Sequence, residues 1–119
     1  MDDYRQQQVE ALQVAHEYSV KIINGISNVI TELRGGRLLD TDEYLKEIVN
    51  GINWLIEVTN RTLDVINENE VLIDKERVNV AINELGAALS KKDDEQIAST
   101  LETGVLEFLK TLETATAGF

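Results

Sequence analysis

Few side chains in this sequence could do chemistry, and their spacing fits no catalytic pattern. Cysteine is absent and His16 is the single histidine. A carboxylate-bridged di-iron site needs Glu-x-x-His motifs from two helices, and a nucleophilic triad needs a histidine beside an activated serine. Gln13 and Glu17, the polar neighbours of His16, complete neither arrangement. We therefore expect no catalytic residue, no metal ligand and no cofactor, and we expect that the protein is not an enzyme.

Two acidic segments, residues 40–43 and 67–70, come near the composition of a calcium loop. Such a loop places oxygen ligands at alternate positions around a central glycine, and neither segment contains that glycine. The pair Gly35-Gly36 lacks the lysine and hydroxyl residue that follow a phosphate-binding loop. Helix capping and solvated loops explain these residues better than ion binding does.

The charge balance is strongly acidic, with 22 acidic residues against 11 basic ones and a net charge of −11. Such a surface repels phosphate groups, so we expect no binding to nucleic acid or to an anionic membrane. The one adjacent basic pair, Lys91-Lys92, is followed at once by three acidic residues. No apolar run approaches the length of a membrane span, and the first residues do not resemble a signal peptide, which predicts a cytoplasmic protein.

Apolar residues recur at helical spacing along four segments, at about residues 4–34, 42–66, 74–91 and 93–113. The absence of proline and the scarcity of aromatic residues also favour helices over sheets. Short connections make each amphipathic helix an antiparallel neighbour of the next. We therefore predict an all-α fold in which residues 1–119 form one domain, an up-down-up-down four-helix bundle built of two helical hairpins.

The ends of these helices carry recognisable signals. Asp40, Asp74 and Asp93 are the expected N-caps of the second, third and fourth helices, and Leu39 with Tyr44 holds the positions of a hydrophobic staple. The link at 67–73 ends in three apolar residues and is expected to fold over one end of the bundle. Residues 114–119 are expected to form a frayed tail.

Each predicted helix contains one internal glycine: Gly25, Gly51, Gly86 and Gly104. A glycine inside a helix costs about 1 kcal/mol relative to alanine, so these positions indicate close approaches between helices. A hinge or a ligand-facing gap is the alternative interpretation. The sequence Ile-Ile-Asn-Gly-Ile around Gly25 returns as Ile-Val-Asn-Gly-Ile around Gly51.

The second predicted helix carries more apolar residues than one face can hold. A second strip lies outside its main apolar face and consists of Gly51, Trp54, Val58 and Val65. Aromatic anchors concentrate binding energy, so this strip is our candidate protein interface, most simply in a two-fold homodimer through the first hairpin. The alternative is that this helix is the most enclosed one of the monomer.

Three segments resemble an uncharacterised family of small acidic helical proteins from Gram-positive bacteria: NELGAALSKKD at 83–93, IASTLE at 97–102, and residues 48–56 with the motif GINW. This resemblance implies a helical fold and implies no active site.

Our leading hypothesis is a non-enzymatic protein–protein interaction module, an adaptor or a chaperone-like helical bundle, whose partner is another protein or a second copy of itself. The alternative is a small-molecule binding or enzymatic bundle with a pocket between helices. Buried polar groups near His16, Tyr18 or the internal glycines would be the first observation in favour of that alternative.

Overall fold

The computed structural model describes residues 2–119, and these residues form helices and short connections without any strand. The helices are α1 (Asp2–Leu33), α2 (Thr41–Ile66), α3 (Lys75–Lys91), α4 (Asp94–Thr100) and α5 (Leu106–Thr116). A π-helical turn, η1 (Leu101–Val105), joins α4 to α5, so that the three segments make one continuous fourth helix. The predicted all-α four-helix fold is confirmed.

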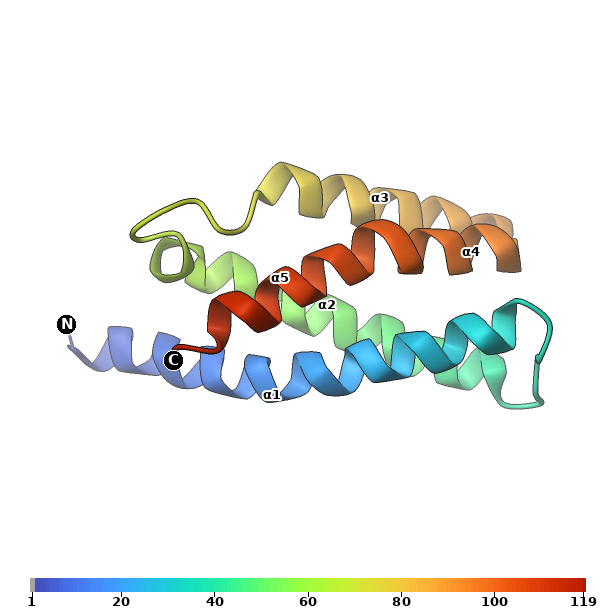
Figure 1. Ribbon diagram of the computed structural model, residues 1–119, viewed down its shortest axis with the longest axis horizontal. Helices are drawn as coiled ribbons and strands as arrows, with labels where there is room; N and C mark the ends of the chain where they lie inside the picture. The colour runs from blue at the N-terminus through green and yellow to red at the C-terminus, as the bar shows by residue number, and fades with distance from the viewer. Residues whose placement is uncertain (1) are drawn as a thin grey trace.

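The molecule is elongated, with extents of 49 × 24 × 19 Å. In Figure 1 both labelled termini lie at the end of the molecule that holds the α2–α3 link, and the α1–α2 loop lies at the opposite end. Close backbone contacts join α1 to α2 and to α5, and join α3 to α4 and η1. Within residues 2–119, α2 and α3 are not joined in this way. The up-down-up-down order, in which each helix packs on the next, therefore stays a prediction.

The core follows the apolar periodicity of the sequence. Leu12, Ile26, Leu55, Leu101 and Leu109, contributed by α1, α2, η1 and α5, are completely buried. Every buried residue of this kind removes its apolar surface from water, which is the main favourable term in folding. None of the helices in the described part of the chain is both long enough and apolar enough to cross a lipid bilayer.

The repeated sequence around Gly25 and Gly51 forms the contact between α1 and α2. A Cβ atom at Gly25 would stand 2.5 Å from Cδ1 of Ile48, and a Cβ atom at Gly51 would stand 2.5 Å from Cδ1 of Ile22. The isoleucine of each helix thus packs on the glycine of the other helix, as the packing interpretation of these glycines requires. The same interpretation fails for Gly86, which has no neighbour within 4 Å of its Cβ position.

This repeat is longer than the sequence alone indicated. Tyr18 and Tyr44 each lie four residues before the isoleucine of their own helix that packs on a glycine. The hydroxyl group of each tyrosine lies beside the glycine of the other helix. The spacing tyrosine, isoleucine, glycine is therefore the same in α1 and α2, and the two helices pair through approximately equivalent residues.

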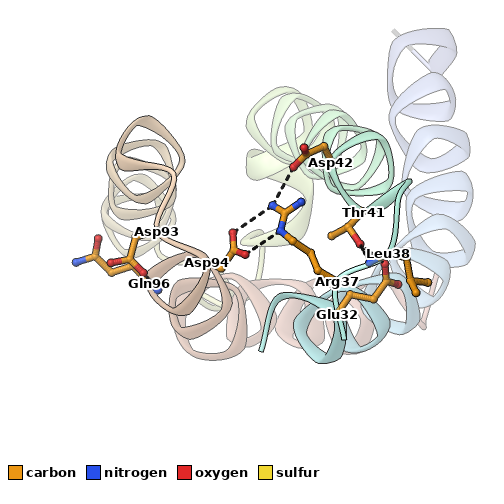
Figure 2. Close-up of polar contacts among 8 residues, drawn as sticks. All are labelled: Glu32, Arg37, Leu38, Thr41, Asp42, Asp93, Asp94 and Gln96. Carbon is orange, nitrogen blue, oxygen red and sulfur yellow. Dashed lines mark hydrogen bonds and ion pairs between the residues drawn. The ribbon is translucent and has the colours of Figure 1, made fainter. Parts of the chain in front are cut away.

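The predicted capping of α2 by Asp40 is wrong, because the Asp40 side chain accepts no hydrogen bond from the helix. Its neighbour Thr41 organises this end of the helix instead (Figure 2). The buried Thr41 hydroxyl accepts a hydrogen bond from the Leu38 amide and donates one to Glu32, each at 2.8 Å. The staple is wrong for the same reason, since this turn leaves Leu39 fully exposed.

The other two predicted caps are confirmed. The Asp74 carboxylate accepts a hydrogen bond from the Glu76 amide at 2.9 Å, and the Asp93 carboxylate accepts one from the Gln96 amide at 3.1 Å. Both aspartates have extended backbone conformations, which is the geometry that N-cap residues adopt.

The predicted frayed tail is also wrong, because α5 continues to Thr116 and its end packs on α1. Thr116 is buried, and Nδ1 of His16 lies 3.0 Å from both the Thr116 hydroxyl and the Glu113 carbonyl oxygen. The side chain of Gln13 donates to the carbonyl of Phe119 at 2.6 Å. Polar side chains of α1 therefore hold the last turn in place.

Candidate functional site

A groove with a volume of about 800 Å³ lies between the first half of α3 and α5. Its apolar lining comes from the α2–α3 link, from α3 and from α5, and consists of Val71, Leu72, Ile73, Val78, Val80, Ala81 and Phe108. In Figure 1 α5 slopes away from α3 toward the end of the molecule that holds the link. We call this feature the α3–α5 groove.

Two features of the sequence create the groove. At its closed end Gly104 faces Ala81, and a Cβ atom on the glycine would lie only 2.9 Å from the alanine Cβ. Two small residues therefore let α3 and the fourth helix touch at this point. The π turn that contains Gly104 has a hydrogen bond from the Leu106 amide to the Leu101 carbonyl, five residues back instead of four, and such turns redirect a helix. Beyond the turn, α5 packs on α1 instead of α3.

The floor of the groove is buried, whereas other apolar residues of its lining are exposed. Val78 and Phe108 are packed into the core. Val71 and Val80 are 77% and 56% exposed, and Leu72 is also exposed. These three side chains line the same opening, so they belong to one surface feature instead of being isolated surface residues.

The position of Val71 and Leu72 corrects a prediction, since we expected the link to fold over the end of the bundle. The side chain of Asn67 fixes the link instead. Its carbonyl oxygen accepts hydrogen bonds from the Leu72 and Ile73 amides at 2.9 and 3.1 Å, and its amide group donates to the Ile73 carbonyl at 3.0 Å. This turn buries Ile73 and leaves the two preceding apolar residues in solvent.

The rim of the groove is acidic. Asp74, Glu76, Glu84 and Glu107 line it, and Arg77 is the one cationic residue among the lining residues that the structure describes. The guanidinium group of Arg77, on α3, lies 3.6 Å from the carboxylate of Glu107, on α5. Both side chains are well exposed, so this ion pair crosses the mouth of the groove without burying either charge.

The four residues of the predicted interface strip differ in burial. Gly51 is buried against α1, and Val58 and Val65 are buried as well, so within one chain these three are not available to a partner. Trp54 is 38% exposed and packs edge to face on Tyr18 with ring centroids 5.4 Å apart. A contact with a second molecule remains a prediction. Of the four residues of the strip, Trp54 is the one that is exposed and could take part in it directly.

The buried polar side chains that the structure describes form hydrogen bonds. In the described part of the chain, no buried side-chain nitrogen or oxygen lacks a hydrogen-bond partner. His16 is bound at the end of α5, and the buried hydroxyl of Ser19 donates to the His16 carbonyl at 2.7 Å. The polar groups near His16 thus join α1 to the end of α5.

The α1–α2 loop is fixed by ion pairs at the end of the molecule opposite the link. Arg37 binds the carboxylates of Asp94, at the start of α4, and of Asp42, in α2, at 2.8 and 2.9 Å (Figure 2). The hydrogen bonds from Arg37 lower the pKa of Asp94. Arg34 pairs with Glu95 and Glu102 at 3.2 and 2.7 Å. Two arginines therefore join the first hairpin to the fourth helix.

Sequence reasoning missed the groove, although one signal was present. Val80 falls outside the buried stripe of α3 and has the acidic residues Glu76 and Glu84 one turn away on either side. An apolar residue on an otherwise charged helix face is the pattern that indicates a contact surface.

The fold and the groove define the class of this protein: a small acidic helical bundle with an apolar groove at one end. Residues 10–115 match the family model described as "Domain of unknown function (DUF8042)", and the chain belongs to this family. No curated protein and no solved structure shows a significant match. This match agrees with the resemblance to an uncharacterised family, and the Gram-positive origin and acidic character of that family stay predictions.

Proposed function

We propose that this protein is a non-enzymatic interaction module of the cytoplasm, an adaptor or a chaperone-like bundle, which binds another protein in the α3–α5 groove. The observation that carries this proposal is the exposure of Val71, Leu72 and Val80 around one opening. Covering such a patch with a partner removes apolar surface from water, which supplies a driving force at about 25 cal/mol per Å².

The construction of the groove supports a binding role. Its closed end depends on a π turn, a feature that is rare in helices and is found frequently at functional sites. Its walls are helices whose inner faces belong to the core, so the shape is present before a partner arrives. A preformed surface binds with a smaller entropic cost than one that must first become ordered.

Capture of binding proteins with two matched variants tests the proposal. Val80→Glu places a charge at the groove, and Val14→Glu places the same charge on α1 at a valine of nearly equal exposure, 54% against 56%. We expect the wild type and Val14→Glu to retain the same partner, and Val80→Glu to retain at least tenfold less, as expected for the loss of a central contact. Equal retention by both variants would contradict a role for the groove.

A small-molecule function is the second candidate, because the volume of the groove lies within the range of ligand sites, about 300 to 1,000 Å³. Mass spectrometry of the purified protein under native conditions distinguishes the two. A bound metabolite that is lost in Val80→Glu and kept in Val14→Glu would favour this second function over protein binding.

A homodimer through the first hairpin is a further proposal, and it depends on Trp54. The exposed part of the indole ring, held in place by Tyr18, is the feature in its favour. Light scattering of the wild type and Trp54→Ser measures it. A dimer that dissociates in the variant supports the proposal, and an unchanged mass with a large loss of stability shows that Trp54 serves the monomer.

A further inference from the structure

We propose that the segment bound by the α3–α5 groove is an amphipathic helix whose apolar face is flanked by lysine and arginine. This inference rests on the proposed function and adds the chemistry of the partner. It follows from three properties of the groove: the state of its backbone groups, the signs of its charges and the placement of one arginine.

The backbone of the groove disfavours an extended peptide. Apart from the α2–α3 link, its walls are helices whose amide and carbonyl groups are mostly paired within the helix, and the cap at Asp74 occupies the Glu76 amide at the start of α3. An extended segment buried here would find few backbone partners, and each unpaired buried group costs about 1 to 3 kcal/mol. A helix satisfies its own backbone and presents only side chains to the groove.

The charges of the groove select a cationic partner. Asp74, Glu76, Glu84 and Glu107 stand against Arg77 alone, so the lining carries a net charge of −3, from four acids and one base. A second copy of this chain would bring a further net charge of −11 toward that rim, and nucleic acid or an anionic bilayer would also be repelled. A helix with basic flanks places opposite charges against the rim while its apolar face covers Val80.

The length of the groove sets the length of the bound segment. The lining residues of α3 run from Glu76 to Glu84, which corresponds to about 12 to 14 Å of helix. A partner helix needs about three turns to cover this distance, with apolar residues at the i, i+3, i+4 and i+7 positions.

Arg77 lies where it competes with such a partner. Its guanidinium group faces Glu107 across the mouth, so an incoming lysine or arginine must displace it to reach that carboxylate. The exchange costs little, because exposed ion pairs contribute only about 0 to 1 kcal/mol. Removing Arg77 also makes the rim more acidic. The structure therefore assigns Arg77 the role of weakening the binding of cationic helices.

Fluorescence anisotropy with a synthetic helix tests this inference. The probe is a labelled peptide of about 18 residues with leucine at the i, i+3, i+4 and i+7 spacing and lysine at the other positions. Its controls are a scrambled peptide of the same composition and a peptide with glutamate in place of lysine. We expect saturable binding of the amphipathic lysine peptide, at least tenfold weaker binding of the scrambled peptide, and no binding of the glutamate peptide.

Variants of the full chain localise the binding. Val80→Ser should weaken it about tenfold and Val14→Ser should leave it unchanged, as expected for a contact at the centre of an interface. Glu84→Gln should weaken it several-fold at low salt, and this difference should disappear near 1 M salt because screening removes it. Arg77→Gln should strengthen it several-fold, which a packing role for Arg77 does not account for and which exceeds the effect of changing a net charge of −11 by one through general attraction.

Three results would overturn the inference: binding that is equal for the scrambled peptide, binding that is insensitive to Val80→Ser, or weaker binding in Arg77→Gln. Its failure can be told apart from that of the proposed function. If the lysine peptide does not bind while a captured protein is still lost in Val80→Glu, the groove binds a partner of different chemistry and only this inference fails.

Discussion

At the residue scale, the internal glycines show why one residue type has opposite effects at different places in a helix. Gly86 faces open space, so it serves no contact. Gly104 faces the Cβ of Ala81, an atom that cannot rotate away without movement of the α3 backbone. The same substitution by alanine therefore adds helix propensity at one site and a steric overlap at the other.

We predict that Gly86→Ala stabilises the protein by about 0.5 to 1 kcal/mol, which is the difference in helix propensity. Gly104→Ala should destabilise it by about 1 to 2 kcal/mol, because overpacking exceeds that gain. Urea unfolding measures both values. The double variant Gly104→Ala/Ala81→Gly is the control for the contact, and it should recover most of the lost stability. No recovery would mean that the glycine is needed for the π turn itself.

The capping residues give a second prediction at this scale. Asp93→Ala removes an observed hydrogen bond to the Gln96 amide and should cost about 1 kcal/mol. Asp40→Ala removes no such bond and should change stability by less than about 0.5 kcal/mol. The two unfolding midpoints provide the comparison. A larger loss for Asp40→Ala would show that Asp40 caps α2 in solution.

At the scale of elements, the ion pairs of the α1–α2 loop make the packing of α4 dependent on pH. Because Arg37 lowers the pKa of Asp94 below its ordinary value of 3.8, the pair contributes its full stability above that value. The contribution is lost as the pH falls through the lowered pKa of the folded state. Arg37→Gln should therefore be less stable than the wild type near neutral pH, and the difference should shrink in strong acid.

Thermal unfolding of both proteins between about pH 7 and about pH 2 measures this difference. Asp42 also pairs with Arg37, so Asp94→Asn should lose only part of what Arg37→Gln loses. A difference that stays constant across this pH range would show that Arg37 acts by packing and not by charge.

The elements were largely predictable from the sequence, since periodic apolar residues such as Val78, Leu85 and Leu112 are buried as expected. The ends of elements were less predictable. Asp40 has the right residue type for a cap, but the Thr41 hydroxyl one residue later is buried and takes the local hydrogen bonds. Which of two adjacent polar side chains forms the local hydrogen bonds depends on three-dimensional packing, which a local pattern does not contain.

The candidate site could not be derived in the same way. Val58 has the helical position of an outer strip, and only the course of the rest of the chain buries it. The groove depends on a π turn at Gly104 and on the divergence of α5 from α3, and Gly104 lies against Ala81, a residue distant in the sequence. The exposed valine at position 80 was visible, but its neighbours across the groove were not.

At the scale of the whole molecule, the net charge of −11 opposes compaction. The observed ion pairs are mostly exposed, and such pairs contribute little. We therefore predict that sodium chloride, raised from about 0.05 M to about 0.5 M, increases the urea midpoint, because it screens the general repulsion more than it weakens these pairs. A midpoint that falls with salt would show that the ion pairs dominate.

The contact between α1 and α2 has a mechanical consequence. Ile22 packs on Gly51 and Ile48 packs on Gly25, so this antiparallel pair of helices contains two equivalent contacts. If one helix slid past the other by a single turn, about 5.4 Å, both of these contacts would break at once. The two helices of the first hairpin therefore resist sliding along each other.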